Sequence, residues 1–161
     1  MNAHVDMSKV TPAALMRGED AEETAGLKEL LEEATAYLNR FNWHRGLGEA
    51  YLGIGVPKIL GVFLFEIVPA SEDVDDKVWV IVGDLPPAYI TTEDAPNPAT
   101  ALDAYIGAME EWVEAAREGR SGEGLIPVNV PPTPENADGL DSRLRFLDKE
   151  ILSQYEEDLQ D

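Results

Sequence analysis

The chain has 161 residues, of which 32 are Asp or Glu and 12 are Lys or Arg, so its formal net charge is −20 at pH 7. A negative field of this size repels nucleic acid and anionic lipid and attracts basic surfaces, which argues against direct binding to nucleic acid or a membrane. The absence of cysteine excludes disulfides, cysteine zinc sites, iron–sulfur clusters and cysteine nucleophiles. The length fits a single domain.

The first 19 residues are predicted to form a flexible N-terminal segment ahead of the folded domain. They carry several charged side chains and no apolar core of the kind that a secretory signal contains, so we expect a cytoplasmic protein. The longest apolar run, Ile59–Phe65, is far shorter than the roughly 20 residues of a membrane-spanning helix. This run is instead typical of a buried strand.

A first helix is predicted from about Ala21 to Phe41. Asp20 stands at the N-cap position with Glu23 three residues later, a variant of the capping box. Apolar side chains recur at three- and four-residue steps and therefore share one face: Leu27, Leu30, Leu31, Ala34, Leu38 and Phe41. We expect this face to pack on the core and the charged face to meet solvent.

Four segments rich in β-branched and aromatic residues follow. They are Glu49–Ile54, Lys58–Val68, Val78–Val82 and the weaker Ala88–Thr92. The polar linker between the second and third predicts a hairpin loop, so the strands should form an antiparallel meander. In the second and third strands the side chains of both faces are apolar. The sheet therefore needs cover on both sides, from helices or from a second subunit.

A second helix is predicted between Asn97, which can cap it, and Gly119, which stands just past its end, with Pro98 in the first turn. Its apolar stripe should pack on the sheet, and its opposite face carries Asp103, Glu110, Glu111, Glu114 and Glu118. Like charges four residues apart cost a helix roughly 0.2–0.5 kcal/mol per pair. The simpler interpretation is a solvated face, and the alternative is a surface that binds a basic partner.

The remaining chain is predicted to supply a third helix. Leu125–Val130 should form a short extended piece at the sheet edge or a covering loop, because Pro127 cannot donate to a strand ladder. Thr133 caps the third helix and Pro134 begins it, with a buried seam of Ala137, Leu140, Leu144, Leu147 and Ile151. Residues 155–161 are acidic and lie at the negative end of the helix dipole, so we expect a frayed tail.

Together these elements predict an α+β fold with a single domain over residues 20–154. A three- to five-stranded, mainly antiparallel meander should carry one N-terminal helix and two C-terminal helices. A monomer and a homodimer both fit, since a second copy could cover one apolar face of the sheet.

Motifs for metal, cofactor or nucleophilic chemistry do not occur. The two histidines, His4 and His44, are far apart in sequence and form no pair at metal-ligand spacing. The glycine pairs Gly46–Gly48 and Gly53–Gly55 lack the context of a phosphate loop and are interpreted as turns and bulges. The carboxylates of Glu72–Asp76 lack the calcium-loop pattern, so a solvated turn is favoured. We expect neither a metal site nor a cofactor.

One strand end offers the ingredients of a pocket. Asp84 closely follows the strand Val78–Val82, a position where sites are often built. Glu66 in the neighbouring strand, Tyr89 and His44 could add a partly buried carboxylate, a phenol and an imidazole. Two carboxylates in unlike surroundings can serve as acid and base. In the simpler interpretation Asp84 organises a turn and the other side chains have structural roles.

Two hypotheses about function follow. The first is a non-enzymatic interaction module of the inhibitor, immunity or adaptor type, whose carboxylates on the second helix bind a basic surface of a partner protein. The first helix or the 72–76 loop could extend that surface. The alternative is a small enzyme or ligand-binding domain with a pocket at Glu66, Asp84 and Tyr89. The sign and the spread of the charge favour the first.

Overall fold

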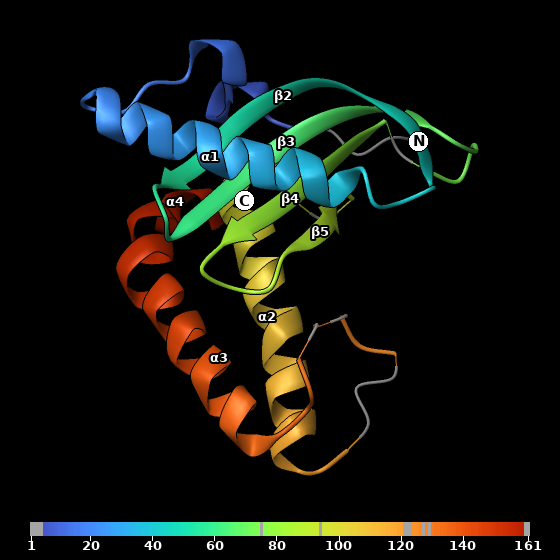
Figure 1. The fold of residues 1–161 in the computed structure, drawn as a ribbon, viewed down its shortest axis with the longest axis vertical. Helices are drawn as coiled ribbons and strands as arrows, with labels where there is room; N and C mark the ends of the chain where they lie inside the picture. Colours follow the sequence, from blue (N-terminus) through green and yellow to red (C-terminus); the bar gives the residue numbers. More distant parts are fainter. Residues whose placement is uncertain are drawn as a thin grey trace.

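The computed structural model describes residues 5–74, 76–93, 95–120, 124–126, 128 and 130–159. Its centre is a five-stranded sheet in the order β1-β2-β3-β4-β5, in which every neighbouring pair is antiparallel (Figure 1). The strands are β1 (Thr11–Pro12), β2 (His44–Val56), β3 (Leu60–Pro69), β4 (Lys77–Gly83) and β5 (Ala88–Thr91). The predicted antiparallel meander is confirmed.

Helices cover both faces of this sheet. α1 (Ala21–Leu38) crosses one face, while α2 (Pro98–Arg117) and α3 (Pro134–Phe146) run side by side on the other (Figure 1). The C-terminal helix continues through a π-helical turn and a 3₁₀ turn, Leu147–Ile151 and Leu152–Tyr155, to α4 (Glu156–Leu159). Two 3₁₀ turns, Met7–Lys9 and Ala13–Leu15, flank β1. The predicted α+β class is confirmed, with cover on both faces from the chain's own helices.

The alternation of side chains along β3 and β4 divides the core into two layers, as the sequence predicts. The layer against α1 contains Phe63, Phe65, Ile67, Val78, Val80 and Val82. The layer against α2 and α3 contains Leu60, Val62, Leu64, Trp79 and Ile81. β3 lies at the middle of the sheet because it is apolar on both faces and pairs along its length with β2 and β4.

Helix starts lie where the capping signals predict. The Asp20 carboxylate accepts a hydrogen bond from the Glu23 amide at 2.8 Å, and Asn97 and Thr133 cap α2 and α3 in the same way. The end of α1 differs, because the helix stops at Leu38 and not at Phe41. The Phe41 amide donates to the carbonyl three residues back, which tightens the chain into a turn. Phe41 therefore lies beyond the helix, beside the start of β2.

β2 is longer than predicted and contains both glycine pairs. Its register with β3 shifts between His44 and Gly46, between Leu47 and Ala50, and between Leu52 and Ile54. The predicted bulges are therefore present, but they interrupt one strand and do not separate two. Gly53 is needed for close packing, since a Cβ there would lie 2.6 Å from the Pro98 ring at the start of α2.

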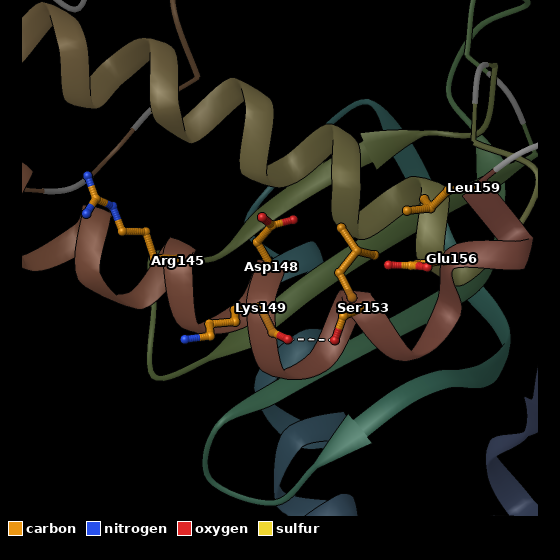
Figure 2. Close-up of a pocket in the computed structure, with 7 residues that line it drawn as sticks. Arg145, Asp148, Lys149, Ser153, Glu156 and Leu159 are labelled. Carbon is orange, nitrogen blue, oxygen red and sulfur yellow. Dashed lines mark hydrogen bonds between the residues drawn. The ribbon is translucent and has the colours of Figure 1, made fainter.

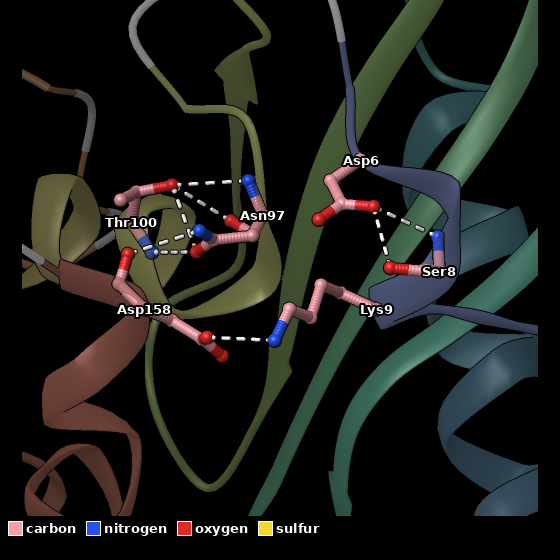
Figure 3. Close-up of polar contacts among 6 residues, drawn as sticks. All are labelled: Asp6, Ser8, Lys9, Asn97, Thr100 and Asp158. Carbon is pink, nitrogen blue, oxygen red and sulfur yellow. Dashed lines mark hydrogen bonds and ion pairs between the residues drawn. The ribbon is translucent and has the colours of Figure 1, made fainter. Parts of the chain in front are cut away.

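The sequence predicts a flexible segment over residues 1–19 and a frayed tail over residues 155–161, and the described parts of both pack on the domain. β1 pairs with Tyr51 and Leu52 of β2, and Val5 is buried against the α2 layer. The Lys9 ammonium lies 2.9 Å from the Asp158 carboxylate, and the Asn97 amide donates to the Asp158 carbonyl at 3.0 Å (Figure 3). Both ends of the described chain thus meet at the N-terminus of α2. Their mobility stays a prediction.

The predicted extended piece Leu125–Val130 is only partly described. Leu125, Ile126, Val128 and Val130 are described and none of them lies in a strand, while Pro127 and Asn129 fall outside the described residues. Ile126 and Val128 are partly buried against the core layer of α2 and α3. The described part is therefore a covering loop rather than an edge strand.

Candidate functional site

α2 presents a row of carboxylates to solvent. All five side chains singled out from the sequence are exposed: Asp103, Glu110, Glu111, Glu114 and Glu118. They lie opposite the buried stripe of the same helix, which contains Leu102, Tyr105, Ile106, Met109, Trp112 and Val113. At 1.5 Å per residue, the row extends about 22 Å along the helix. We call these five residues the acidic face of α2.

Few cations neutralise the acidic face of α2. Among the described residues, its only ion pair joins Glu118 to Arg120. Arg117 belongs to the same helix, but its guanidinium contacts Asp138 and Asp141 of α3 at 2.7 and 3.2 Å. The other four carboxylates are therefore solvated and available to a partner.

Gly107 lies on the same exposed side of α2, between Asp103 and Glu110, and because glycine has no side chain the helix surface is flat there. A Cβ built at this position would find no heavy atom within 4 Å. Packing inside the domain therefore does not require a glycine here. The flat place lets another backbone approach α2 between Asp103 and Glu110.

Asp84 lies at the predicted strand end, and the surface around it is hollowed. Three adjoining hollows share Asp84: one of about 330 Å³ against α3, one of about 270 Å³ beside Ile59, and one of about 320 Å³ beside α1. The Asp84 amide donates to the Ile59 carbonyl at 3.0 Å, which joins the β2–β3 turn to the β4–β5 loop. The Arg143 guanidinium of α3 lies 3.5 Å from the Asp84 carboxylate.

Glu66 lies far from Asp84. The register of β3 with β4 pairs Glu66 with Lys77 at one end of the sheet and Leu60 with Gly83 at the other. Six residues along a strand separate these two ends by about 20 Å. Glu66 instead accepts a hydrogen bond from the Tyr51 hydroxyl at 3.3 Å. The strand pairing does not bring the two carboxylates together.

Tyr89 and His44 lie in an aromatic cluster that closes the core beyond the end of α1. The ring of Tyr89 is 5.2 Å from that of Phe41 and 5.0 Å from that of Trp43. His44 packs edge-on against Trp43, and its Nε2 lies 2.7 Å from the Leu38 carbonyl, to which it can donate. This contact links the start of β2 to the last turn of α1. We call Tyr37, Phe41, Trp43, His44 and Tyr89 the aromatic cluster.

Two buried polar atoms of the aromatic cluster have no hydrogen-bond partner among the described residues, Trp43 Nε1 and His44 Nδ1. Because Nε2 of His44 faces a carbonyl, which can only accept, Nε2 is the donor in this arrangement. The cluster thus combines Tyr89 and His44 of the alternative pocket, without either of its carboxylates.

The carboxylates of Glu72–Asp76 lie in the loop between β3 and β4. Glu72, Asp73 and Asp76 are exposed, and Asp75 falls outside the described residues, as does His4. Asp76 lies 3.9 Å from Lys77. Over the described part of the chain, no three His, Asp or Glu side chains gather in a way that could hold a metal ion.

The sequence did not indicate the largest hollow that we describe, one of about 580 Å³ along the C-terminal helix (Figure 2). Arg145, Asp148, Lys149 and Glu156 give it equal numbers of basic and acidic side chains. Its Ser153 hydroxyl donates to the Lys149 carbonyl at 2.6 Å, and Arg145 pairs with Asp141. The balanced charge and the engaged hydroxyl favour no class of ligand.

Phe146 lies beside the strand end at Asp84, and the sequence did not single it out. It lies on α3 outside the buried seam, is exposed, and lines the hollow beside Ile59. An aromatic residue off the seam of an otherwise polar helix face was the signal that could have found it.

A comparison of this chain with family models, with curated proteins and with solved structures found no match. Within the described part of the chain, no helix is both long and apolar enough to cross a bilayer.

Proposed function

We propose that this protein is a non-enzymatic interaction module, of the inhibitor, immunity or adaptor type, that binds a basic surface of a partner protein through the acidic face of α2. The observation that carries the proposal is the row of four exposed carboxylates with no ion pair among the described residues: Asp103, Glu110, Glu111 and Glu114. A partner with complementary positive charge would relieve their mutual repulsion on binding.

The direction of Arg117 supports the same proposal. An arginine on the last turn of α2 could neutralise a neighbouring glutamate, yet it bridges to Asp138 and Asp141 of α3. The basic side chain therefore ties the two helices together and leaves Asp103, Glu110, Glu111 and Glu114 without an ion pair among the described residues. With the net charge of −20, this face should steer a basic protein toward α2 and repel nucleic acid.

The alternative, an enzyme or ligand-binding domain built on Glu66, Asp84 and Tyr89, has less support. The β3–β4 register places Glu66 and Asp84 at opposite ends of the strand pair. Tyr89 packs among the rings of Phe41 and Trp43. Acid and base catalysis needs both groups within hydrogen-bond reach of one substrate, and this arrangement does not offer that.

The test is capture of partners from the host lysate on immobilised wild-type protein at about 0.05 and 0.5 M salt, a range over which the screening length falls about threefold. We expect one stoichiometric basic protein, bound at low salt and released at high salt. Its affinity is then measured with the purified partner and the D103N/E110Q/E111Q/E114Q variant. Exposed charge pairs contribute about 0.2–1 kcal/mol each, so the four changes should weaken binding roughly fourfold or more.

A matched control removes the same charge elsewhere. The variant E19Q/E49Q/E93Q/E150Q changes four exposed carboxylates outside α1, α2 and the β3–β4 loop, none of which forms an ion pair among the described residues. Its affinity should stay close to that of wild type, because contacts at α2 and not the net charge of the chain should decide the affinity. Equal weakening by both variants would show that the loss of affinity comes from the change in net charge. Unchanged binding by the α2 variant would show that the acidic face of α2 is not part of the interface.

A further inference from the structure

The hollow of about 270 Å³ beside Asp84 is an apolar groove between three separate parts of the chain. Ile59 from the β2–β3 turn, Leu85 from the β4–β5 loop, and Phe146 and Leu147 from the C-terminal helix supply its apolar walls. Ile59 and Phe146 are 37% and 45% exposed. Large exposed apolar side chains that gather around a concave surface are typical of a binding site for another molecule. We call this hollow the strand-end groove.

The apolar surface continues into the neighbouring hollow of about 330 Å³. Pro86, Pro87, Val128 and Val130 line that hollow, and Val130 is a further large apolar side chain that is exposed. Both hollows share Asp84, Leu85 and Arg143. The two hollows follow one another along the C-terminal helix from Glu135 to Leu147, which suits a segment of polypeptide better than a compact small molecule.

Hydrogen bonds hold the walls of the strand-end groove in place. The Ile59 amide donates to the Val56 carbonyl at 2.9 Å, and the Ile59 carbonyl accepts from the Asp84 amide at 3.0 Å. Behind the groove, the buried Tyr105 hydroxyl donates to the Pro86 carbonyl at 2.6 Å. A groove that is already formed loses little conformational entropy when it is filled, so a small contact area can give measurable binding.

The charges around the groove favour a ligand that carries positive charge. The strand-end groove itself is lined by one acidic and one basic side chain, Asp84 and Arg143, and the excess of negative charge lies in the two hollows beside it. Glu135 lines one of these hollows, and Glu29 and Glu33 line the other together with Lys58. Among these described residues, the only ion pair joins Asp84 to Arg143, at 3.5 Å and with both side chains largely exposed. Such a pair is weak and easily exchanged. The local excess of negative charge has the same sign as the charge of the whole chain.

We propose that the strand-end groove is a docking site for a large apolar side chain flanked by basic residues, presented by a segment of a partner protein. The apolar side chain fills the space between Ile59 and Phe146, and the flanking cations meet Asp84 and Glu135. The groove uses other elements than the acidic face of α2, so it can be tested separately from the proposed function.

The test uses three short peptides, blocked by acetyl and amide groups, as probes of the full-length ¹⁵N-labelled protein. Acetyl-Arg-Phe-Arg-amide, acetyl-Arg-Ser-Arg-amide and acetyl-Glu-Phe-Glu-amide are titrated to millimolar concentration while amide shifts are recorded by NMR. We expect saturable shifts with Arg-Phe-Arg at the amides of Ile59, Leu85 and Phe146. Binding of the other two peptides should be at least about tenfold weaker, because Arg-Ser-Arg lacks the apolar side chain and Glu-Phe-Glu lacks the basic ones.

Three variants make the result specific. Phe146→Ser should weaken Arg-Phe-Arg binding about fivefold or more, and Phe146→Leu should retain most of it. Val68→Ser changes an exposed apolar side chain of β3 outside the groove and should leave binding unchanged. Phe146 is exposed, so these substitutions should leave the fold intact, which the rest of the NMR spectrum reports directly.

Four outcomes would overturn the proposal. They are the absence of any saturable shift, shifts outside the groove, equal binding of Glu-Phe-Glu, and concentration-dependent shifts at the groove without peptide, which would place a second copy there. The D103N/E110Q/E111Q/E114Q variant separates the two sites. It should keep its groove shifts, and their loss would place the peptide on the acidic face of α2 and leave the proposed function standing.

Discussion

The two faces of the sheet differ in how completely they satisfy their buried polar groups. On the α2 face, the Trp79 indole donates to the Ala95 carbonyl at 2.8 Å and the Tyr105 hydroxyl donates to the Pro86 carbonyl at 2.6 Å. On the α1 face, the aromatic cluster buries Trp43 Nε1 and His44 Nδ1 with no partner in the described part of the chain. The α2 face therefore combines apolar burial with hydrogen bonds, while the aromatic cluster of the α1 face pairs His44 Nε2 with the Leu38 carbonyl and depends on packing around its two other buried polar atoms.

The two faces of the sheet also differ in the helices that cover them. α1 is the main cover of its face, and partly buried side chains such as Trp43 and Leu47 close the edges of that layer. On the other face, α2 packs on the sheet and the C-terminal helix packs on α2, so residues as distant as Val5 and Ile151 join one core. The α2 face is therefore the more strongly specified half of the fold. Each face has a tryptophan, a helical glycine and a buried tyrosine, and these three pairs test the comparison.

The tryptophans should show the largest difference. Trp79 is fully buried and hydrogen-bonded, so Trp79→Ala should lower the free energy of unfolding by about 3–5 kcal/mol. Trp43 is only half-buried and its indole has no partner, so Trp43→Ala should cost clearly less. Urea unfolding followed by circular dichroism measures both without relying on tryptophan fluorescence.

Phenylalanine variants serve as the control for this pair. Trp43→Phe removes an unsatisfied N–H and should be nearly neutral, whereas Trp79→Phe leaves the Ala95 carbonyl without its donor and should cost about 1–3 kcal/mol. Equal losses for the two tryptophans would contradict the comparison.

The helical glycines should shift stability in opposite directions. A Cβ at Gly26 of α1 would lie 2.6 Å from the rigid Pro57 ring, so Gly26→Ala should cost about 1–3 kcal/mol through overpacking. Gly107 of α2 has open space around it, so Gly107→Ala should gain about 0.5–1 kcal/mol from helix propensity. Thermal unfolding of both variants measures this, at about 2–4 °C per kcal/mol for a chain of this size. A gain from both substitutions would show that α1 can move away from Pro57 at little cost.

The tyrosines should show the smallest difference, and it should depend on pH. Burial raises the pKa of Tyr37 to about 12, and burial also raises the pKa of the more deeply buried Tyr105. The folded state favours the neutral phenol, so this contribution to stability is complete below the unfolded pKa of about 10 and is lost as pH rises toward the folded pKa. We expect destabilisation to begin near pH 10, together with tyrosinate absorbance.

Substitution by phenylalanine assigns this loss to each face. Tyr37→Phe should reduce the fall in stability between about pH 10 and 12, and should change stability little at pH 8, since no hydrogen bond is described for its hydroxyl. Tyr105→Phe should cost about 0.5–1.5 kcal/mol already at pH 8, because the bond to the Pro86 carbonyl is lost. An unchanged pH profile for Tyr37→Phe would mean that its ring is solvated in solution.

Much of the fold could be predicted because its signals are local. Asp20, Asn97 and Thr133 each cap a helix within three residues of chain, and the α3 seam repeats at helical spacing. The acidic face of α2 follows from the same periodicity. The end of α1 was missed, because the turn that removes Phe41 from the helix depends on where β2 begins.

The two candidate sites differ in the same respect, because one results from a local pattern and the other from contacts between distant segments. The solvent-facing carboxylates of α2 are set by helical period, which the sequence contains. The strand-end groove joins Ile59, Leu85 and Phe146, which are 26 and 61 residues apart along the chain. No local pattern relates such positions, since only the packing of α3 on α2, beside the β2–β3 turn and the β4–β5 loop, places them side by side.

The sequence by itself thus determined the element types, the helix starts, the two-faced strands and the acidic face, because each results from interactions within a few residues or from a fixed side-chain period. Tertiary structure alone decided three other features. It separated Glu66 from Asp84 through the β3–β4 register, collected the aromatic cluster from α1, β2 and β5, and paired residues 11–12 with β2. Their common physical reason is that contacts between distant segments depend on the register and docking of whole elements.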